Sequence, residues 1–423
     1  MTWYLIIPFA VLILAFVVKM PIAYGMILSG ITYALVKGLS LSVVASSIVN
    51  SLFGSFVIIA VPLFIFAANI MNSTTITERV FDFANAIVGR RRGGLGHVNC
   101  LASLVFSGMT GSAVADASGL GLMEVDAMRK AGYDDGFTAA ITAASATMGP
   151  IFPPSIPMIM YAVLSGASVS ALFEGGMIPA VLLCASLMLY VGYVSRKRQY
   201  PYSKSVKGKE FWKTTLHSLP ALLTPVILLG GIYSGVCTAT EAGAVAAFYT
   251  ILISLVFYHT LSWKSLKKTM VDTAKSTGAI GLMIGAAACM SFIVTNEHVP
   301  DAIAAAMLSF THNKYVFYLI INIIFLILGM FIDTQTMLVV FIPLVLPVVK
   351  ALGIDLIHFG VVIILNTMIG LSTPPFGMLL FVTSGVSGTP IKTIIKEIWP
   401  MILVMIGVLM LITYVPWLVT CLT

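Results

Sequence analysis

Charged residues are scarce in this chain. Asp, Glu, Lys and Arg make up 9% of its 423 residues, whereas a soluble domain carries about 25%. Hydrophobic residues make up 59%, and apolar runs recur along the whole length. Most of the surface must therefore face something other than water. Because strand-like alternation is absent and a helix needs roughly 20 apolar residues to cross a bilayer, the sequence predicts an all-α polytopic membrane protein.

The chain also lacks the motifs of several enzyme and binding classes. Its five cysteines are isolated, with no C-x-x-C pair, and its six histidines form no H-E-x-x-H or similar ligand cluster. No Walker A loop is present, so we expect no ATP to be used by that route. The net charge of +7 could suggest nucleic acid, but orientation in the membrane explains it better. These features argue against an enzyme and against a nucleic-acid partner.

The apolar segments have unequal lengths. They lie at roughly 3–18, 21–36, 43–71, 94–128, 136–164, 171–194, 219–234, 238–258, 278–297, 315–349, 356–385 and 398–419. The segments at 94–128 and 315–349 are too long for one span, and each has a glycine-rich or polar centre. Each is therefore either one long tilted helix or a hairpin that enters and leaves on the same side.

The basic residues favour the hairpins, because cytoplasmic loops are enriched in Lys and Arg. If the N-terminus is outside and both long segments are hairpins, all but three of the 23 Lys and Arg fall on the inside. The exceptions are Lys37, Lys314 and Lys350. The sequence thus predicts about ten spanning helices, two re-entrant hairpins and a periplasmic N-terminus. Amphipathic segments at 75–92 and 262–277 are expected at the cytoplasmic interface.

The two halves share backbone-breaking residues at an offset of 221. Gly108-Met109 aligns with Gly329-Met330, Gly149 with Gly370, and Pro153-Pro154 with Pro374-Pro375. An odd number of spans separates equivalent points, so the halves should be inverted. We predict a first repeat at 1–194, a basic cytoplasmic linker at 195–218 and a second repeat at 219–423. Inverted repeats with broken helices are typical of secondary transporters.

The strongest local signals are two proline-rich runs, GPIFPPSIP at 149–157 and GLSTPPFG at 370–377. Neither can continue an α-helix. A break frees backbone carbonyls, which suit a hard cation, and presents a helix N-terminus, which suits an anion. With the nearest hairpin tips, they give these candidate cation ligands: Thr110, Ser112, Gly149, Phe152, Pro154, Asp333, Thr334, Gly370, Thr373 and Pro375.

A second group of residues near the breaks could bind a substrate. These candidates are Asp116, Ser145, Ser155, Asn366 and Thr373. Because no Arg or Lys falls in these segments, an anion would be held by helix N-termini, hydroxyl groups, Asn366 and the cations. Small residues at the tips also permit close helix packing without any site. Glu241 is a further acidic candidate, for which interfacial exposure or stabilisation of a helix N-terminus is an equal alternative.

Five stretches carry a resemblance to the large membrane subunit of tripartite ATP-independent periplasmic (TRAP) transporters. They lie at 107–116, 143–161, 230–243, 329–347 and 366–381. The resemblance implies an elevator mechanism, coupling to two or more sodium ions and a bacterial inner-membrane location. It also implies a small four-helix membrane subunit (DctQ-like), a periplasmic substrate-binding protein (DctP-like) and an organic-acid substrate of the C4-dicarboxylate or sialic acid class.

Two other functions remain open at this point. One is a stand-alone sodium- or proton-coupled carrier of carboxylates or other anions with a similar hairpin architecture. The genes beside it would discriminate, because a TRAP permease needs a binding protein and a small subunit. The other is an intramembrane enzyme, which would need a His-x-x-x-His motif, an aspartate pair or a Ser–His or Ser–Lys dyad at one depth, and we find none.

Overall fold

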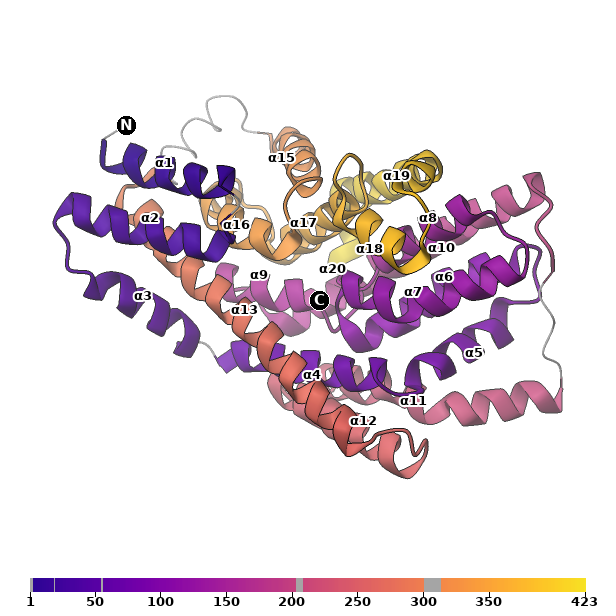
Figure 1. The fold of residues 1–423 in the computed structure, drawn as a ribbon. Coiled ribbons are helices and arrows are strands. Elements are labelled where there is room, and N and C mark those ends of the chain that lie inside the picture. The colour runs from indigo at the N-terminus through magenta and orange to yellow at the C-terminus, as the bar shows by residue number, and fades with distance from the viewer. Residues whose placement is uncertain (1–2, 19, 55, 203–207, 300–312) are drawn as a thin grey trace.

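The apolar segments of the first half fold into helices that end at glycine, proline or capping residues. The computed structural model describes residues 3–18, 20–54, 56–202, 208–299 and 313–423 (Figure 1). The first half contains α1 (Trp3–Val17), α2 (Ile22–Lys37), α3 (Ser42–Phe53), the 3-10 turn η1 (Phe56–Ile59), α4 (Ala60–Asn72), α5 (Ile76–Val88), α6 (Gly94–Thr110), α7 (Ala113–Lys130), α8 (Asp135–Ala146), α9 (Ile156–Ser165) and α10 (Val169–Lys197).

The second half repeats this use of short helices around breaks. It contains α11 (Lys209–Tyr233), α12 (Ala239–Val256), α13 (Trp263–Asn296), α15 (Lys314–Gly329), α16 (Thr334–Ala351), α17 (Leu356–Leu371), α18 (Met378–Ser387), α19 (Ile391–Tyr414) and α20 (Trp417–Thr420). Every regular element in the described ranges is thus helical, as the composition predicts. Both long segments are divided near their glycine-rich centres, between α6 and α7 and between α15 and α16.

Some element boundaries differ from those expected. The segment at 43–71 is not one straight helix, because α3 and the η1–α4 unit meet at 66°. Helix α11 begins at Lys209, inside the stretch that the sequence assigns to a linker. Residues 203–207 of that stretch, with Lys204 and Lys207, lie outside the described residues. The apolar pattern indicates which part of a helix lies in lipid. It does not indicate how many polar turns, such as those at the start of α11, extend the helix beyond the lipid.

Helix α13 is one continuous element of 34 residues, so the predicted boundary between segments 262–277 and 278–297 is wrong. A glycine in this region serves helix packing. A Cβ atom on Gly285 would lie 2.9 Å from a methyl carbon of Ile48 in α3. The glycine therefore allows α3 to approach closely, and α13 runs diagonally across the molecule (Figure 1).

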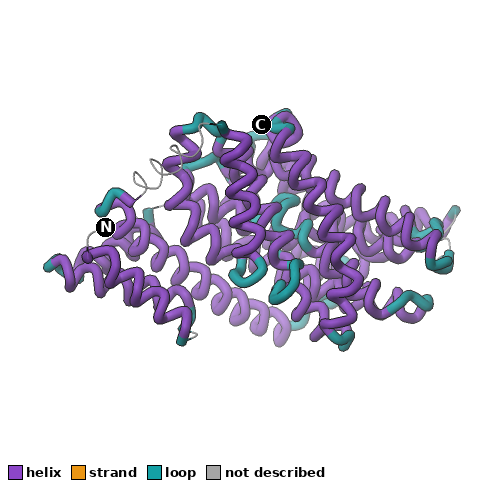
Figure 2. The backbone as a smooth tube through the Cα atoms, turned by 90° about the horizontal axis from the view of Figure 1, so that it is seen from above, coloured by secondary structure: helices purple, strands orange, loops and turns teal. Residues whose placement is uncertain are grey.

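The helices pack in two groups. Helices α1 to α4 pack with α12 and α13, while α6 to α10 pack with α15 to α19. Within the second group the contacts are reciprocal, since α9 packs against α16 and α7 against α18. Figure 2 shows loop segments in the middle of the molecule with helices on both sides. Such an interior position is unusual for loops, which normally run over the surface.

A charged cluster joins the two halves at one end of the second group. The Arg198 guanidinium lies 2.9 Å from a carboxylate oxygen of Asp134 and 2.8 Å from one of Glu397. The Tyr200 hydroxyl donates a hydrogen bond to Asp134 at 2.6 Å. This hydrogen bond, together with Arg198, holds the pKa of Asp134 below its usual range. Asp134 precedes α8 and Glu397 lies in α19, so the cluster fixes the two halves against each other.

Six helices of the described residues are individually long and apolar enough to cross a bilayer, or seven if α3 and α4 form one bent span. The six are α10, α11, α12, α13, α16 and α19. The remaining apolar helices are shorter, because glycine and proline interrupt them. The architecture is that of a multi-pass membrane protein, while the count of ten spans and the inverted orientation of the halves remain predictions.

Candidate functional site

The first helix break interrupts the segment predicted at 136–164. Helix α8 ends before the proline-rich turn and α9 begins after it, because proline lacks the N–H that a helix interior needs. Ser155 is the N-cap of α9, where its Oγ accepts a hydrogen bond from the Met158 N–H at 3.2 Å. The same hydroxyl donates to the Pro150 carbonyl. The hydroxyl of this substrate candidate therefore holds the turn together.

The tip between α6 and α7 lies directly on this break. Gly111 ends α6 with a positive φ of 61°, and a Cβ atom there would overlap the carbonyl oxygen of Pro154. A Cβ on Gly149 would lie 3.1 Å from the backbone nitrogen of Ala113. Ser112 caps α7 by accepting a hydrogen bond from its first turn at 3.4 Å. The structure thus brings the predicted residues of the first half together, and glycine is what allows it.

Two other cation candidates of the first half lie beside this contact. The Thr110 hydroxyl is buried and donates to the Phe106 carbonyl at 3.4 Å. The Phe152 ring packs against α6, where a Cβ on Gly108 would lie 3.2 Å from a ring carbon. In this conformation the Thr110 hydroxyl is bonded within α6 and the Phe152 ring lies against α6. The groups that remain suited to a cation are therefore the backbone carbonyls of the turn between α8 and α9.

The second break has the same plan. Helix α15 ends at Gly329, and a Cβ atom on Gly370 would lie 2.7 Å from the Gly329 Cα. The Thr373 hydroxyl donates to the Ile369 carbonyl at 2.6 Å, which completes the last turn of α17. Pro375 is exposed, whereas its counterpart in the first break is buried. The tip of the second half therefore also lies on its own break, but this half-site is the more open of the two.

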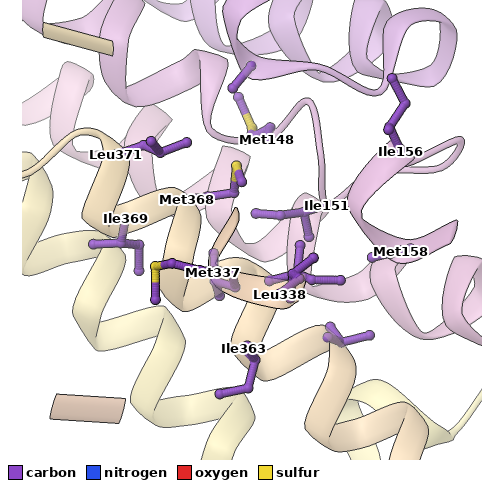
Figure 3. Close-up of a cluster of buried hydrophobic side chains, with 14 of the residues drawn as sticks. Met148, Ile151, Ile156, Met158, Met337, Leu338, Ile363, Met368, Ile369 and Leu371 are labelled. Carbon is purple, nitrogen blue, oxygen red and sulfur yellow. The ribbon is translucent and has the colours of Figure 1, made fainter. Parts of the chain in front are cut away.

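One apolar core connects the two breaks. Met148 and Ile151 of the first break belong to the same buried cluster as Met368 and Leu371 at the end of α17, with Met337 from α16 among them (Figure 3). All five side chains are largely buried. A well-packed core transmits displacement rather than absorbing it. The two half-sites therefore form one packed body.

Asp333 and Thr334 stand at the tip of the second half. Asp333 is the N-cap of α16, and its carboxylate accepts hydrogen bonds from the Thr336 N–H at 3.1 Å and the Thr336 hydroxyl at 2.5 Å. It is only partly buried. The carboxylate of this cation candidate is therefore already hydrogen-bonded within its own helix. The Thr334 hydroxyl, in contrast, is buried and has no partner among the described residues.

Asp116, named above as a substrate candidate, is more deeply buried than Asp333. Asp116 is 1% exposed, and neither carboxylate oxygen makes a hydrogen bond of ordinary geometry within the described part of the chain, although the Ser103 hydroxyl of α6 lies near the carboxylate. It lies in the first turn of α7, directly after the tip. A buried charge without a partner is very costly, so this carboxylate must be neutralised by a proton, a cation or a donor on a ligand.

A buried polar network surrounds the neighbouring Ser145. Its hydroxyl donates to the Asn99 side-chain oxygen at 2.7 Å and accepts from Ser103 at 3.2 Å. Asn99 in turn donates to the Thr142 hydroxyl at 2.8 Å. The network joins α6 to α8, and α7 packs on both. The substrate candidate Ser145 is thus a link in the three-helix unit that carries Asp116.

Asn366 occupies the equivalent place in the second half, 221 positions after Ser145. Its side-chain nitrogen donates to the Asn322 backbone and side-chain oxygens, both at 2.9 Å. Its own side-chain oxygen is buried without a partner among the described residues. In each half, buried polar hydrogen bonds therefore connect the first helix of the hairpin, α6 or α15, to the broken helix, α8 or α17. The side-chain oxygen of Asn366 remains available as a hydrogen-bond acceptor.

Glu124 is a residue that the sequence did not single out. It is 1% exposed, and neither carboxylate oxygen has a partner within the described ranges. It lies two turns beyond Asp116 on the same side of α7. The signal was present as an acidic residue eight positions after Asp116, but the charged residues around it suggest a solvated helix end.

Glu241 has a structural explanation. Thr238 and Glu241 form a capping box at the start of α12, in which the Glu241 carboxylate accepts from the Thr238 N–H at 2.8 Å. This arrangement satisfies otherwise unpaired N–H groups at the helix start. Glu241 is also exposed, so the structure supports both structural alternatives: an exposed position and stabilisation of a helix N-terminus.

The chemistry available at the centre comes mainly from the backbone. Helices α7, α9, α16 and α18 begin at the two tips and the two breaks. A helix N-terminus carries about half a positive charge, and the turns before it expose carbonyl oxygens. The arrangement can therefore bind a carboxylate at the N-termini and cations at the turns without any basic side chain.

A separate crevice opens between the two helix groups. It has a volume of about 700 Å³ and is lined by Asn50 of α3, Ile284 of α13, Leu164 of α9 and Leu346 of α16, among others. None of the predicted ligands lines it. The crevice lies where one group meets the other, so it marks a boundary rather than the site itself.

Comparison with known families matches residues 9–418 to the family described as "Tripartite ATP-independent periplasmic transporter, DctM component". The chain is 39% identical over 398 residues to the sialic acid TRAP transporter large permease protein SiaM of Vibrio cholerae, covering 94% of this chain and 93% of that protein. It is 35% identical to the C4-dicarboxylate TRAP transporter large permease protein DctM of Pseudomonas aeruginosa, covering 85% and 84%.

Two further comparisons extend this picture. The chain is 40% identical to the sialic acid TRAP transporter permease protein SiaT of Haemophilus influenzae over 86% of its own length, but this match covers 59% of that longer protein. Among solved structures, the YdaH transporter of Alcanivorax borkumensis aligns with a TM-score of 0.65 at 14% identity, over 89% of this chain and 88% of that one. The similarity to the YdaH structure shows a similar fold only.

Proposed function

Because the chain belongs to the DctM-component family of tripartite ATP-independent periplasmic transporters and is a large permease component, we propose that it imports a small organic acid together with sodium ions. It is a transporter component and not an enzyme. The observation that carries the proposal is that each half covers a broken helix with its own glycine turn, around one shared core. Broken helices are costly in lipid unless they are buried or line a site.

The cations would bind at the two turns. Sodium is the coupling ion that suits unwound backbone carbonyls and hydroxyl groups, and the turns around Gly149 and Gly370 supply both. The unpartnered Asp116 carboxylate supports a positive ligand at the first half-site. The substrate carboxylate would lie between the half-sites, near the helix N-termini and Asn366.

The proposed substrate and partners follow from the family. Relatives are named for sialic acid and for C4-dicarboxylates, and we propose a substrate of one of these classes. A periplasmic binding protein of the DctP type would deliver it, and a DctQ-like four-helix subunit would complete the permease. The chain would lie in a bacterial inner membrane with its N-terminus in the periplasm, as the basic residues indicate.

Uptake of an organic acid is expected to require sodium and no ATP. The chain would be reconstituted with its small subunit into vesicles, and a panel of labelled acids would be offered with and without the binding protein. Replacing external sodium by choline should reduce uptake to background. Uptake that persists in choline with the pH gradient collapsed would contradict sodium coupling, and uptake without any binding protein would instead favour the stand-alone carrier.

The Asp333→Asn variant tests whether Asp333 binds a cation or serves only as the N-cap of α16. Asn and Asp are similar N-caps, so folding should be unchanged, whereas the loss of charge should weaken sodium binding by about tenfold. Asp355→Asn is the matched control, because Asp355 caps α17 through the His358 N–H at 2.8 Å. Sodium-induced thermal stabilisation should fall in the first variant only. Equal stabilisation in both would show that Asp333 is a cap and nothing more.

We also propose that the body containing both half-sites moves as a unit against the group formed by α1 to α4, α12 and α13. The packing of α9 against α16 and of α7 against α18 ties the two half-sites together and supports this elevator motion. In a variant without native cysteines, Val57→Cys and Val163→Cys should cross-link, since both residues line one crevice. Val57→Cys should also react with a second set of positions, displaced along α8 and α9 by several turns. One invariant set, with and without sodium and substrate, would exclude the motion.

A further inference from the structure

A second pocket lies away from the breaks, at the end of the molecule where basic residues gather. It has a volume of about 1100 Å³ and opens beside the turn between α5 and α6 and the last turns of α10. Its lining combines a basic rim with an apolar wall: Arg91, Arg92, His97, Ala185, Met188, Leu189, Gly192, Tyr193, Arg196 and Tyr202. None of these residues takes part in the proposed transport site.

The rim carries three arginines whose charges are not neutralised. In the described ranges Arg91, Arg92 and Arg196 form no ion pair, although Arg79, Arg129 and Arg198 do. The Arg92 guanidinium lies over the Tyr202 ring at 5.8 Å, which holds it at the pocket. Arginine presents several fixed donors that match the oxygens of a phosphate group. The rim is therefore complementary to an anion.

A buried polar atom is also present in the pocket. His97 is 5% exposed, yet it lines the pocket, and its Nδ1 has no hydrogen-bond partner among the described residues. Buried polar groups normally have a partner. The ring lies beside Gly192, where a Cβ atom would be 3.7 Å from the His97 Cε1. The pocket thus offers a ligand one more polar contact below the arginines.

The wall of the pocket is one face of α10. Positions 185, 188, 189, 192, 193 and 196 have the spacing of residues that share a helix face. The face is apolar or aromatic except for Arg196 at its end. Leu189 is 77% exposed and Tyr193 64%, which is expected for side chains that contact lipid. From position 185 to 196 the face extends about 16 Å along the helix axis.

We propose that this pocket binds an anionic phospholipid, with its phosphate at Arg91, Arg92 and Arg196 and an acyl chain along the α10 face. A soluble anion would contact only the arginines of the rim, and it would not explain why an apolar face lines the rest of the pocket. The basic rim would face the headgroup and the apolar wall would face the acyl chain of a lipid. The distribution of basic residues places this end of the molecule at the cytoplasmic leaflet. The ligand would contact α6 and α10, which belong to the body that carries the breaks.

The test uses the purified full-length chain in a neutral detergent and follows its thermal unfolding. Dioleoylphosphatidylglycerol should raise the midpoint, while dioleoylphosphatidylcholine and inorganic phosphate should not. The triple variant Arg91→Gln, Arg92→Gln, Arg196→Gln should bind phosphatidylglycerol about 100-fold more weakly, since each basic residue contributes about a factor of five. The matched control is Lys264→Gln, Lys267→Gln, Lys268→Gln, which removes the same charge from exposed positions of α13 and should keep wild-type affinity.

A second variant tests the apolar wall if the triple variant does not fold. Gly192→Leu keeps every arginine and places a side chain in the pocket, so it should also lose the phosphatidylglycerol effect. Undiminished binding in the triple variant or in Gly192→Leu would overturn the proposal. An equal effect of inorganic phosphate would assign the rim to a soluble anion, and equal loss in the lysine control would reduce the effect to net charge.

Discussion

Gly111→Ala is expected to abolish transport, whereas Gly166→Ala should retain most of it. Both glycines end a helix with a positive φ, 61° and 78°, so alanine costs each of them about 1–2 kcal/mol of backbone strain. Only Gly111 touches another segment, because its Cβ atom would overlap the Pro154 carbonyl, while nothing lies within 4 Å of a Cβ on Gly166. The difference between the two variants isolates the contact between tip and break.

The measurement is sodium-dependent uptake in vesicles, normalised to folded protein. A loss of at least about 100-fold is expected for Gly111→Ala, since a displacement of about 1 Å at a binding site can have an effect of that size. Thermal unfolding should show modest destabilisation of Gly166→Ala and a larger one of Gly111→Ala, which is why uptake is compared per amount of folded protein. If Gly111→Ala transports as well as Gly166→Ala, the tip does not need to close on the break and the first half-site is wrongly placed.

Asp116→Asn should remove most of the sodium response without reducing stability. The wild-type carboxylate is buried without a basic partner and without a hydrogen bond of ordinary geometry in the described residues. Burying its charge therefore costs free energy on folding, and a neutral amide lowers that cost. The midpoint of unfolding without sodium should therefore stay the same or rise. A hydrogen bond or ion contact to a charged group contributes about 1.5–3 kcal/mol, so sodium affinity should fall about 10- to 100-fold.

Asp126→Asn is the control for this variant, because Asp126 lies on the same helix but is exposed. Sodium titrations of thermal stability and of uptake would be compared for both. Retained sodium affinity in Asp116→Asn would show that a proton neutralises Asp116, or that a substrate hydroxyl does. Glu124→Gln then becomes the next variant, since its carboxylate is equally buried and equally without a partner.

The backbone breaks could be predicted because they depend on local residue types. The proline-rich runs interrupt a helix whatever surrounds them, and Gly111 and Gly329 mark turns for a similar reason. The pairing of tips with breaks also followed from sequence order, and the packing around Gly111, Gly149 and Gly370 places these segments together. The resemblance to the TRAP family is confirmed by the match over residues 9–418.

Other features depend on which helices meet, and the sequence does not contain that information locally. The role of Gly285 becomes visible only when α3 is placed against α13. Asp333 and Asp116 look alike in the sequence, since both follow a glycine-containing tip, but one caps its helix and the other has no partner. Glu124 looks like part of a solvated helix end because Asp126, Arg129 and Lys130 follow it. The buried polar pairs of Asn99 and Asn366 likewise appear only once the helices are packed.

The continuity of α13 gives the two halves different mechanical properties. In the first half, α4 and α5 are separate helices joined by a turn, so a hinge is available between membrane and surface. In the second half, 34 residues form one rod about 51 Å long, of which residues 278–296 alone cover about 28 Å, close to the thickness of the hydrocarbon layer. The remaining part continues along α4, where the Thr273 hydroxyl accepts a hydrogen bond from the Asn69 side chain at 3.0 Å. A displacement of its basic end must therefore move the part that packs on α3 as well, whereas α5 can change its angle to α4 at the turn between them.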